Sequence, residues 1–105
     1  MRIIIEDEYL ANLYENGQSL GKPKFGQQIE LAFIKRVIQL EQAPDTNTLR
    51  QIKSLHFEQL KGNLKGKNSI RVKDGFRLIF RVEKDGNNKR IEIIAIEELN
   101  NHYAK

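Results

Sequence analysis

A histidine followed by a run of basic side chains is the strongest sign of chemistry in this chain of 105 residues. His56 is followed by several cations, among them Lys61, Arg71 and Arg77. An imidazole titrates near neutral pH and can donate or accept a proton, while fixed cations stabilise an anionic transition state. This combination favours metal-free phosphoryl chemistry, such as cleavage of RNA by attack of its own 2′-hydroxyl group. The alternative is a histidine that is only structural or exposed.

Other catalytic classes lack the residues that they require. The chain has no cysteine, which excludes thiolate nucleophiles, zinc ribbons and iron–sulfur clusters. Its two histidines, His56 and His102, are not spaced as metal ligands. The glycines form no phosphate-binding or dinucleotide fingerprint. We therefore expect neither a metal nor a cofactor.

The positive charge is concentrated in one part of the chain. The net charge is only +4, yet residues 50–90 contain twelve basic and four acidic side chains, and both flanking parts are net negative. Such a concentration indicates a surface for a polyanion, the alternative being a solvated basic face without a partner. The residues expected to contact nucleic acid are Lys65, Lys67, Arg71, Lys73 and Arg81.

The hydrophobic pattern changes from helical to alternating along the chain, which predicts an α+β fold in a single domain spanning residues 1–105. No segment is apolar enough for a membrane span or a signal peptide, so we expect a cytoplasmic protein with no membrane contact. The expected elements are a strand at 1–5, helices at 6–16 and 25–42, a short helix near 46–52, strands at 69–73, 76–82 and 90–96, a further strand near 57–61, and a polar tail at 99–105.

The hairpin formed by the strands at 69–73 and 76–82 has a register that its pattern predicts. A three-residue loop at 73–75 pairs Val72 with Phe76 and Ile70 with Leu78, which keeps all four side chains on the core face. It also places Arg71 opposite Arg77 on the other face. Like charges in that position destabilise a sheet unless an anion lies between them, or unless nearby acids such as Glu92 pair with the arginines. On the first interpretation, Arg77→Ala should change folding little.

The segment Leu55-His56-Phe57-Glu58-Gln59-Leu60-Lys61-Gly62 and the later run from Gly66 to Phe80 together carry a recognisable signature. It reads Leu-His-x-Leu-Lys-Gly, then Ser-Ile-Arg-Val-x-Asp-x-aromatic-Arg-aliphatic-x-Phe, then a strand rich in isoleucine. The first element has two extra residues after His56. The chain thus resembles the RelE/ParE toxin superfamily, and most of all its HigB, or plasmid-maintenance killer, branch. The resemblance is strong over residues 48–97 and is one of pattern only in the helical first half.

The resemblance implies helices packed on a curved antiparallel sheet, and a type II toxin that cleaves mRNA in the ribosomal A site. It also implies an inhibiting antitoxin, typically with a helix-turn-helix domain. His56, Lys61 and Arg77 match catalytic positions of the family. Many members end their last strand with Asp-Tyr-His, whereas in this sequence His102 and Tyr103 come several residues later. Either these two residues complete the catalytic site or Glu97 replaces the carboxylate.

Two other functions remain open on the sequence alone. One is a non-enzymatic inhibitor like the ParE branch, which acts on gyrase and needs no counterpart of His56 with its cationic hairpin. The other is a decayed toxin, or a basic nucleic-acid-binding module. The leading hypothesis is a ribosome-dependent endoribonuclease, because a ribosome that positions the codon lets a few catalytic groups suffice.

Overall fold

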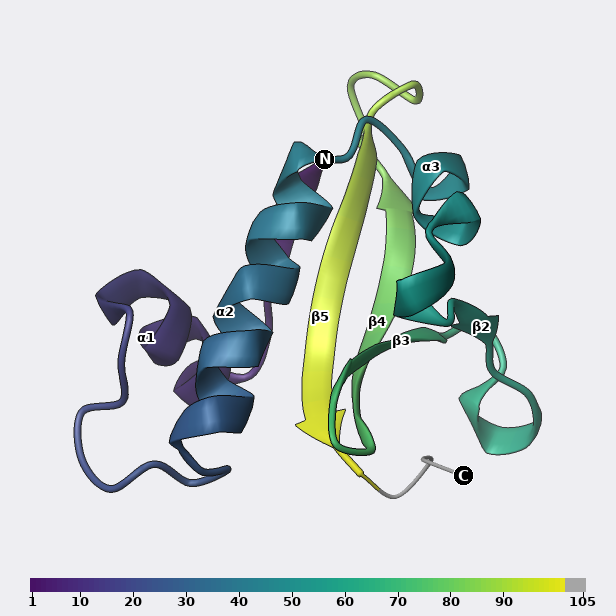
Figure 1. Cartoon of the computed structure of the whole chain (residues 1–105). Helices are drawn as coiled ribbons and strands as arrows, with labels where there is room; N and C mark the ends of the chain where they lie inside the picture. The colour runs from purple at the N-terminus through teal and green to yellow at the C-terminus, as the bar shows by residue number, and fades with distance from the viewer. Residues whose placement is uncertain (102–105) are drawn as a thin grey trace.

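The computed structural model describes residues 1–101, which run from one strand through three helices into four further strands (Figure 1). This order confirms the α+β prediction. The elements are β1 (Arg2–Ile5), α1 (Glu8–Asn16), α2 (Gln27–Gln42), α3 (Thr46–Gln51), the 3₁₀ turn η1 (Lys53–Leu55), β2 (Glu58–Gln59), the 3₁₀ turn η2 (Gly62–Leu64), β3 (Asn68–Lys73), β4 (Phe76–Lys84) and β5 (Glu92–Asn100).

The five strands form one sheet in the order β1-β5-β4-β3-β2. All neighbours are antiparallel except β1 and β5, which run parallel with Ile3 beside Ile94 and Ile5 beside Ile96. The sheet is therefore mixed, whereas the resemblance implied an antiparallel one. The N-terminal ammonium holds β1 in place by donating hydrogen bonds to the carbonyls of Glu41 and Ala43, each 2.7 Å long, at the end of α2.

The core lies between α2 and one face of the sheet, which we call the helix face. Phe33, Val37 and Leu40 recur at helical spacing on α2 and are fully buried. They belong to one buried cluster with side chains of three strands: Ile70, Leu78, Phe80, Ile94 and Ile96. Burial of this apolar surface is the main stabilising contribution to the fold. The other face, which we call the polar face, carries Ser69, Arg71, Arg77, Arg81 and Glu97.

The helix starts use side chains that accept hydrogen bonds from free backbone amides. The Asp7 carboxylate accepts from Leu10 N at 2.9 Å and caps α1, which ends at the left-handed Gly17. Helix α2 begins two residues later than the pattern predicted and has no capping side chain. The buried Glu30 carboxylate instead accepts from the Tyr9 hydroxyl at 2.6 Å and from Phe25 N at 3.1 Å, which joins α1 to the start of α2.

The β3–β4 hairpin has the predicted pairing in its body but a different loop. Ile70 lies opposite Leu78 and Arg71 opposite Arg77, as the pattern predicted. The three-residue loop is wrong, and so is the pairing of Val72 with Phe76. Asp74 and Gly75, with φ of 50° and 83°, form a two-residue turn of type I′, and a bulge takes up Val72. The bulge lets Val72 remain in the core although Lys73 is the residue opposite Phe76.

Strand β5 continues well beyond the end that alternation predicted. Phe80 pairs with Ile96 and Ile79 with Glu98, so Glu97 is an extra residue in the strand. Because of this bulge, the next buried side chain after Ile96 comes three residues later instead of two. Leu99 is that residue, and it lies on the helix face. The predicted polar tail at 99–105 is therefore wrong for its first two residues, which belong to the sheet. Asn100 lies opposite Arg77.

The hairpin turn leads to a first test of the fold. Gly75→Ala should lower the free energy of unfolding by about 1 kcal/mol, because a side chain at φ 83° is strained. The measurement is urea unfolding followed by circular dichroism. The matched control is Gly86→Ala in the β4–β5 loop, where an added Cβ has open space and φ is not positive, and where the change should stay within about 0.5 kcal/mol. Equal effects at the two glycines would contradict the type I′ turn.

Candidate functional site

His56 lies in a left-handed turn that its two neighbours fix in place. The turn follows η1, and His56 adopts φ 46°, a region that residues other than glycine seldom occupy. Leu55 is fully buried, and the Phe57 ring packs edge-on against Phe80 with centroids 5.7 Å apart. His56 itself is exposed. The core therefore anchors the backbone on both sides while the imidazole remains open to solvent.

Arg77 connects this turn to the sheet. The residue is 8% exposed, and its Nε donates to Ser69 Oγ at 2.8 Å. One Nη atom donates to the His56 carbonyl oxygen at 2.5 Å and lies 3.4 Å from the Ser69 carbonyl oxygen. Arg77 thus ties β4 to β3 and holds the strained residue through its backbone. Among residues 1–101 no carboxylate lies within ion-pair distance of it, so its charge faces neutral acceptors.

These bonds change the argument about the paired arginines. Arg71 is directly opposite Arg77 in the register but remains exposed, whereas Arg77 is turned toward Ser69 and the His56 carbonyl. Neutral acceptors therefore solvate one of the two guanidinium groups, and the pair does not require an anion for the fold to form. Ser69 carries no catalytic signature in the sequence, and its role as the acceptor for Arg77 was not predicted.

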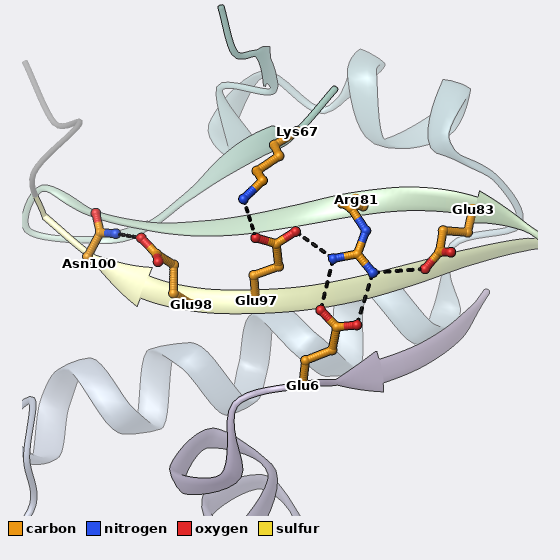
Figure 2. Close-up of polar contacts among 7 residues, drawn as sticks. All are labelled: Glu6, Lys67, Arg81, Glu83, Glu97, Glu98 and Asn100. Atoms are coloured by element: carbon orange, nitrogen blue, oxygen red, sulfur yellow. Dashed lines mark hydrogen bonds and ion pairs between the residues drawn. The ribbon is translucent and has the colours of Figure 1, made fainter. Parts of the chain in front are cut away.

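Arg81 is in a different situation, because carboxylates surround it (Figure 2). Its guanidinium contacts both oxygens of Glu6 at 2.9 Å, Glu97 at 2.6 Å and Glu83 at 3.1 Å. Lys67 adds an ion pair of 2.7 Å with the other oxygen of Glu97. For Arg81 and Lys67 the structure therefore shows the alternative weighed in the sequence analysis, in which nearby acids pair with the cations. The acids are not the expected Glu92, however, whose carboxylate accepts from the backbone and side chain of Thr46.

The network shifts the pKa values of its members so that the acids stay negatively charged and the bases stay positively charged. The hydrogen bond from Arg81 lowers the pKa of Glu6, and the Glu97 carboxylate raises the pKa of Lys67. Burial would raise the pKa of Glu97, but Lys67 and Arg81 outweigh it and lower that pKa. Glu97 is therefore an ionised partner of two cations on the polar face. It is the bulge residue of β5, three residues before Asn100, which lies opposite Arg77.

The remaining predicted cations form two exposed groups. Arg71 and Lys73 lie at the end of β3, beside the hairpin turn. Lys61 and Lys65 flank the η2 turn at its two ends. There they line a groove of about 500 Å³, which we call the basic groove, together with Lys67 and with Arg50, which the sequence did not single out. Arg50 also stacks over the Phe57 ring, 4.7 Å from its centroid, and so joins the groove to the His56 turn.

Two predicted site residues, His102 and Tyr103, lie outside the described residues. What the structure does show is the path that leads to them, because β5 reaches the position opposite Arg77 at Asn100. The Asn100 side chain also donates a hydrogen bond to the Glu98 carboxylate. In the described part of the chain, no three histidine, aspartate or glutamate side chains are grouped to hold a metal ion. None of the helices within residues 1–101 is long and apolar enough to cross a membrane.

Comparisons with known proteins agree with this architecture. Residues 4–94 match a family model described as the RelE-like toxin of the type II toxin–antitoxin system HigB. The chain is 35% identical over 81 residues to Toxin HigB-1 of Vibrio cholerae, an alignment that covers 77% of this chain and 83% of the relative.

Solved structures with lower identity share the fold. A YoeB/ParE toxin from Agrobacterium tumefaciens superposes with a TM-score of 0.55 at 18% identity, covering 98% of this chain and all of the other. YafQ from E. coli gives 0.54 at 13% identity, covering 97% and 94% of the two chains. The YoeB-YefM complex from Staphylococcus aureus gives 0.50 at 21% identity, covering 98% of each.

The contacts of Arg77 predict a stability effect opposite to the one expected from the sequence. Arg77→Ala should lower the free energy of unfolding by about 1–3 kcal/mol, because it leaves the Ser69 hydroxyl and the His56 carbonyl without their donor. Arg71→Ala removes the same charge from the opposite, exposed position and should change it by no more than about 0.5 kcal/mol. Urea unfolding of both variants makes the comparison. If Arg77→Ala unfolds at the same urea concentration as Arg71→Ala, the Arg77 bonds do not stabilise the domain.

Proposed function

The chain belongs to the HigB-like family of RelE-like toxins from type II toxin–antitoxin systems, and from this premise we propose that it is a ribosome-dependent endoribonuclease. In this proposal it cleaves mRNA in the ribosomal A site without a metal ion and so inhibits translation. The site of action is then the cytoplasm, where the ribosomes are. The antitoxin encoded with it neutralises this activity.

The observation that carries the proposal is the hydrogen bond between Arg77 and the carbonyl of His56. Strained non-glycine residues persist only where the surrounding structure holds them, and they cluster at functional sites. In this chain Arg77 holds such a residue, and its imidazole is exposed to a substrate. A catalytic group must be kept in one orientation to contribute its full effect, and this turn supplies that constraint.

In the proposed reaction, His56 transfers a proton to or from the reacting RNA oxygens. Lys61 and Arg77 supply positive charge for the phosphorane, in which negative charge accumulates on the phosphate oxygens. A second proton-transfer group is needed at the other oxygen. His102 and Tyr103 are proposed for that role, supported by the path of β5, which brings the chain to the position opposite Arg77 two residues earlier.

Phosphate contacts are proposed for the exposed cations that have no carboxylate partner among the described residues. These are Arg71 and Lys73 at the hairpin and Lys65 in the basic groove. Lys67 and Arg81, expected from the sequence to bind nucleic acid as well, are instead proposed to stabilise the polar face, because carboxylates already neutralise both.

The partner proposed for the free toxin is an antitoxin that blocks its entry into the ribosome. Support comes from the fold shared with the toxin of the YoeB-YefM complex. The A site admits only a small object, so an added protein can prevent entry by its bulk alone. An antitoxin with a helix-turn-helix domain is proposed on the resemblance to the HigB branch.

Single-turnover cleavage on ribosomes carrying a defined mRNA tests the proposed enzyme. His56→Ala should slow cleavage by roughly 10²–10⁴-fold while binding to the ribosome persists, since a general acid or base contributes about that much. The matched control is Lys89→Ala in the exposed β4–β5 loop, which should cleave like the unaltered protein. Mapping of mRNA 5′ ends locates the cuts. Absence of any cleavage by the unaltered protein, together with inhibition of gyrase, would favour the ParE-like alternative instead.

A further inference from the structure

Arg50 lies between an aromatic ring and the basic groove. The central carbon of its guanidinium is 4.7 Å from the centroid of the Phe57 ring, which is close enough for a cation–π contact. Phe57 in turn packs edge-on against the fully buried Phe80, so the core holds this ring in place. Arg50 itself is exposed and lines the groove. One face of the planar guanidinium therefore lies on Phe57, and its other face is open to the groove.

Arg50 makes no ion pair in the described part of the chain. Among the described residues that line the groove, the acid is Glu92. Its carboxylate accepts hydrogen bonds of 2.9 Å from both the backbone N and the Oγ1 of Thr46. A guanidinium is more weakly hydrated than an ammonium group, and it stacks on flat π systems. The open face of Arg50 is therefore suited to an aromatic ligand.

A second segment that lines the groove supplies ammonium groups. Residues 60–67 form a closed loop, in which Leu60 N donates to the Lys67 carbonyl oxygen at 2.9 Å. Lys61 and Lys65 are exposed on this loop, line the groove and form no ion pair with any described residue. The groove thus combines one stacking surface with two ammonium groups in about 500 Å³, a volume in the range of clefts that hold small organic ligands.

We propose that the basic groove holds one unpaired nucleotide of the RNA substrate, with its base stacked on the open face of Arg50. Lys61, which stabilises the phosphorane in the proposed reaction, lines the same groove, so the stacked base belongs to a nucleotide that adjoins the cleaved bond. Lys65 then contacts the next phosphate along the strand. The inference rests on the proposed function for the identity of the RNA. It adds a contact to a base, made by Arg50, to the phosphate contacts of that proposal.

An unpaired nucleotide fits the groove better than other anionic ligands do. In a duplex the faces of each base are covered by its neighbours, so only an unpaired base can stack on a guanidinium. An acidic peptide would pair with Lys61 and Lys65 but would leave the open face of Arg50 unused. A free nucleotide offers the same base and phosphate as an RNA strand. Affinity separates these two sources, because only a strand extends to cations outside the groove.

The stacking contact also predicts which bases the groove prefers. The N–H groups of a guanidinium lie in its own plane, so a guanidinium that lies flat on a base directs them past the base and not at its hydrogen-bonding edge. Discrimination then follows from the area of the ring, because a purine covers more of the Arg50 guanidinium than a pyrimidine does. We expect adenine and guanine to be favoured about equally over uracil and cytosine at this position.

Binding of a short RNA to the full chain tests the groove without the ribosome. The probe is a 2′-O-methylated hexa-adenylate, which lacks the hydroxyl group that attacks in the proposed reaction, and its abasic counterpart is the control ligand. Arg50→Lys keeps the charge but loses the flat surface. It should weaken binding of the hexa-adenylate roughly tenfold and leave binding of the abasic strand within about twofold. The matched control is Arg90→Lys in the exposed β4–β5 loop, which should bind both strands like the unaltered protein.

Equal losses for the two strands, or equal losses in Arg50→Lys and Arg90→Lys, would overturn the stacking contact. Adenosine monophosphate that binds as tightly as the hexa-adenylate would assign the groove to a free nucleotide and overturn its assignment to RNA.

A second measurement uses programmed ribosomes. Arg50→Lys should slow single-turnover cleavage of an mRNA with purines on both sides of the cleaved bond, and it should cleave at the rate of the unaltered protein when those two nucleotides are abasic. Equal slowing on both mRNAs would contradict a contact to the base. Absence of cleavage by the unaltered protein would contradict the proposed function instead, and the binding of the hexa-adenylate would still report on the groove.

Discussion

The hydrogen bonds of one buried arginine are the interaction on which the site depends. Arg77 reaches from β4 to Ser69 on β3 and to the carbonyl of His56, so two strands of the sheet and the His56 turn meet at its guanidinium. Its position is possible because the β3–β4 register places it opposite Arg71, where one guanidinium can turn inward and the other outward. The left-handed backbone of His56 is then held by a charged donor, and hydrogen bonds of that kind are among the stronger ones in proteins.

The polar face separates charges that neutralise one another from charges that are available to a ligand. Glu6, Glu83 and Glu97 surround Arg81, and Glu97 also binds Lys67, so these cations stabilise the contact between β1, β4 and β5 (Figure 2). Arg71 and Lys73, by contrast, are exposed at the hairpin. A count of basic residues overstates the surface open to a polyanion, because it treats both groups alike.

The sequence predicted the order of helices and strands, the body of the hairpin and the pairing of its two arginines, since these depend on hydrophobic periodicity and on one register. It failed where a bulge adds a residue. The bulge at Glu97 breaks the alternation that marks a strand, which concealed the extension of β5 to Asn100, and the bulge at Val72 concealed the two-residue turn. The acids around Arg81 could not be assigned either, because Glu6 lies 75 residues away and only the parallel pairing of β1 with β5 brings it there.

A double-mutant cycle on cleavage tests most directly whether Arg77 acts through His56. Single-turnover rates on programmed ribosomes are compared for His56→Ala, Arg77→Ala and the double variant, at a temperature at which circular dichroism shows all three to be folded. If Arg77 positions the imidazole in addition to supplying positive charge for the phosphorane, its removal costs less once His56 is gone, and the double variant cleaves faster than the product of the two single losses predicts. If the two losses multiply in full, Arg77 acts independently of His56, and a positioning role for its hydrogen bonds is contradicted.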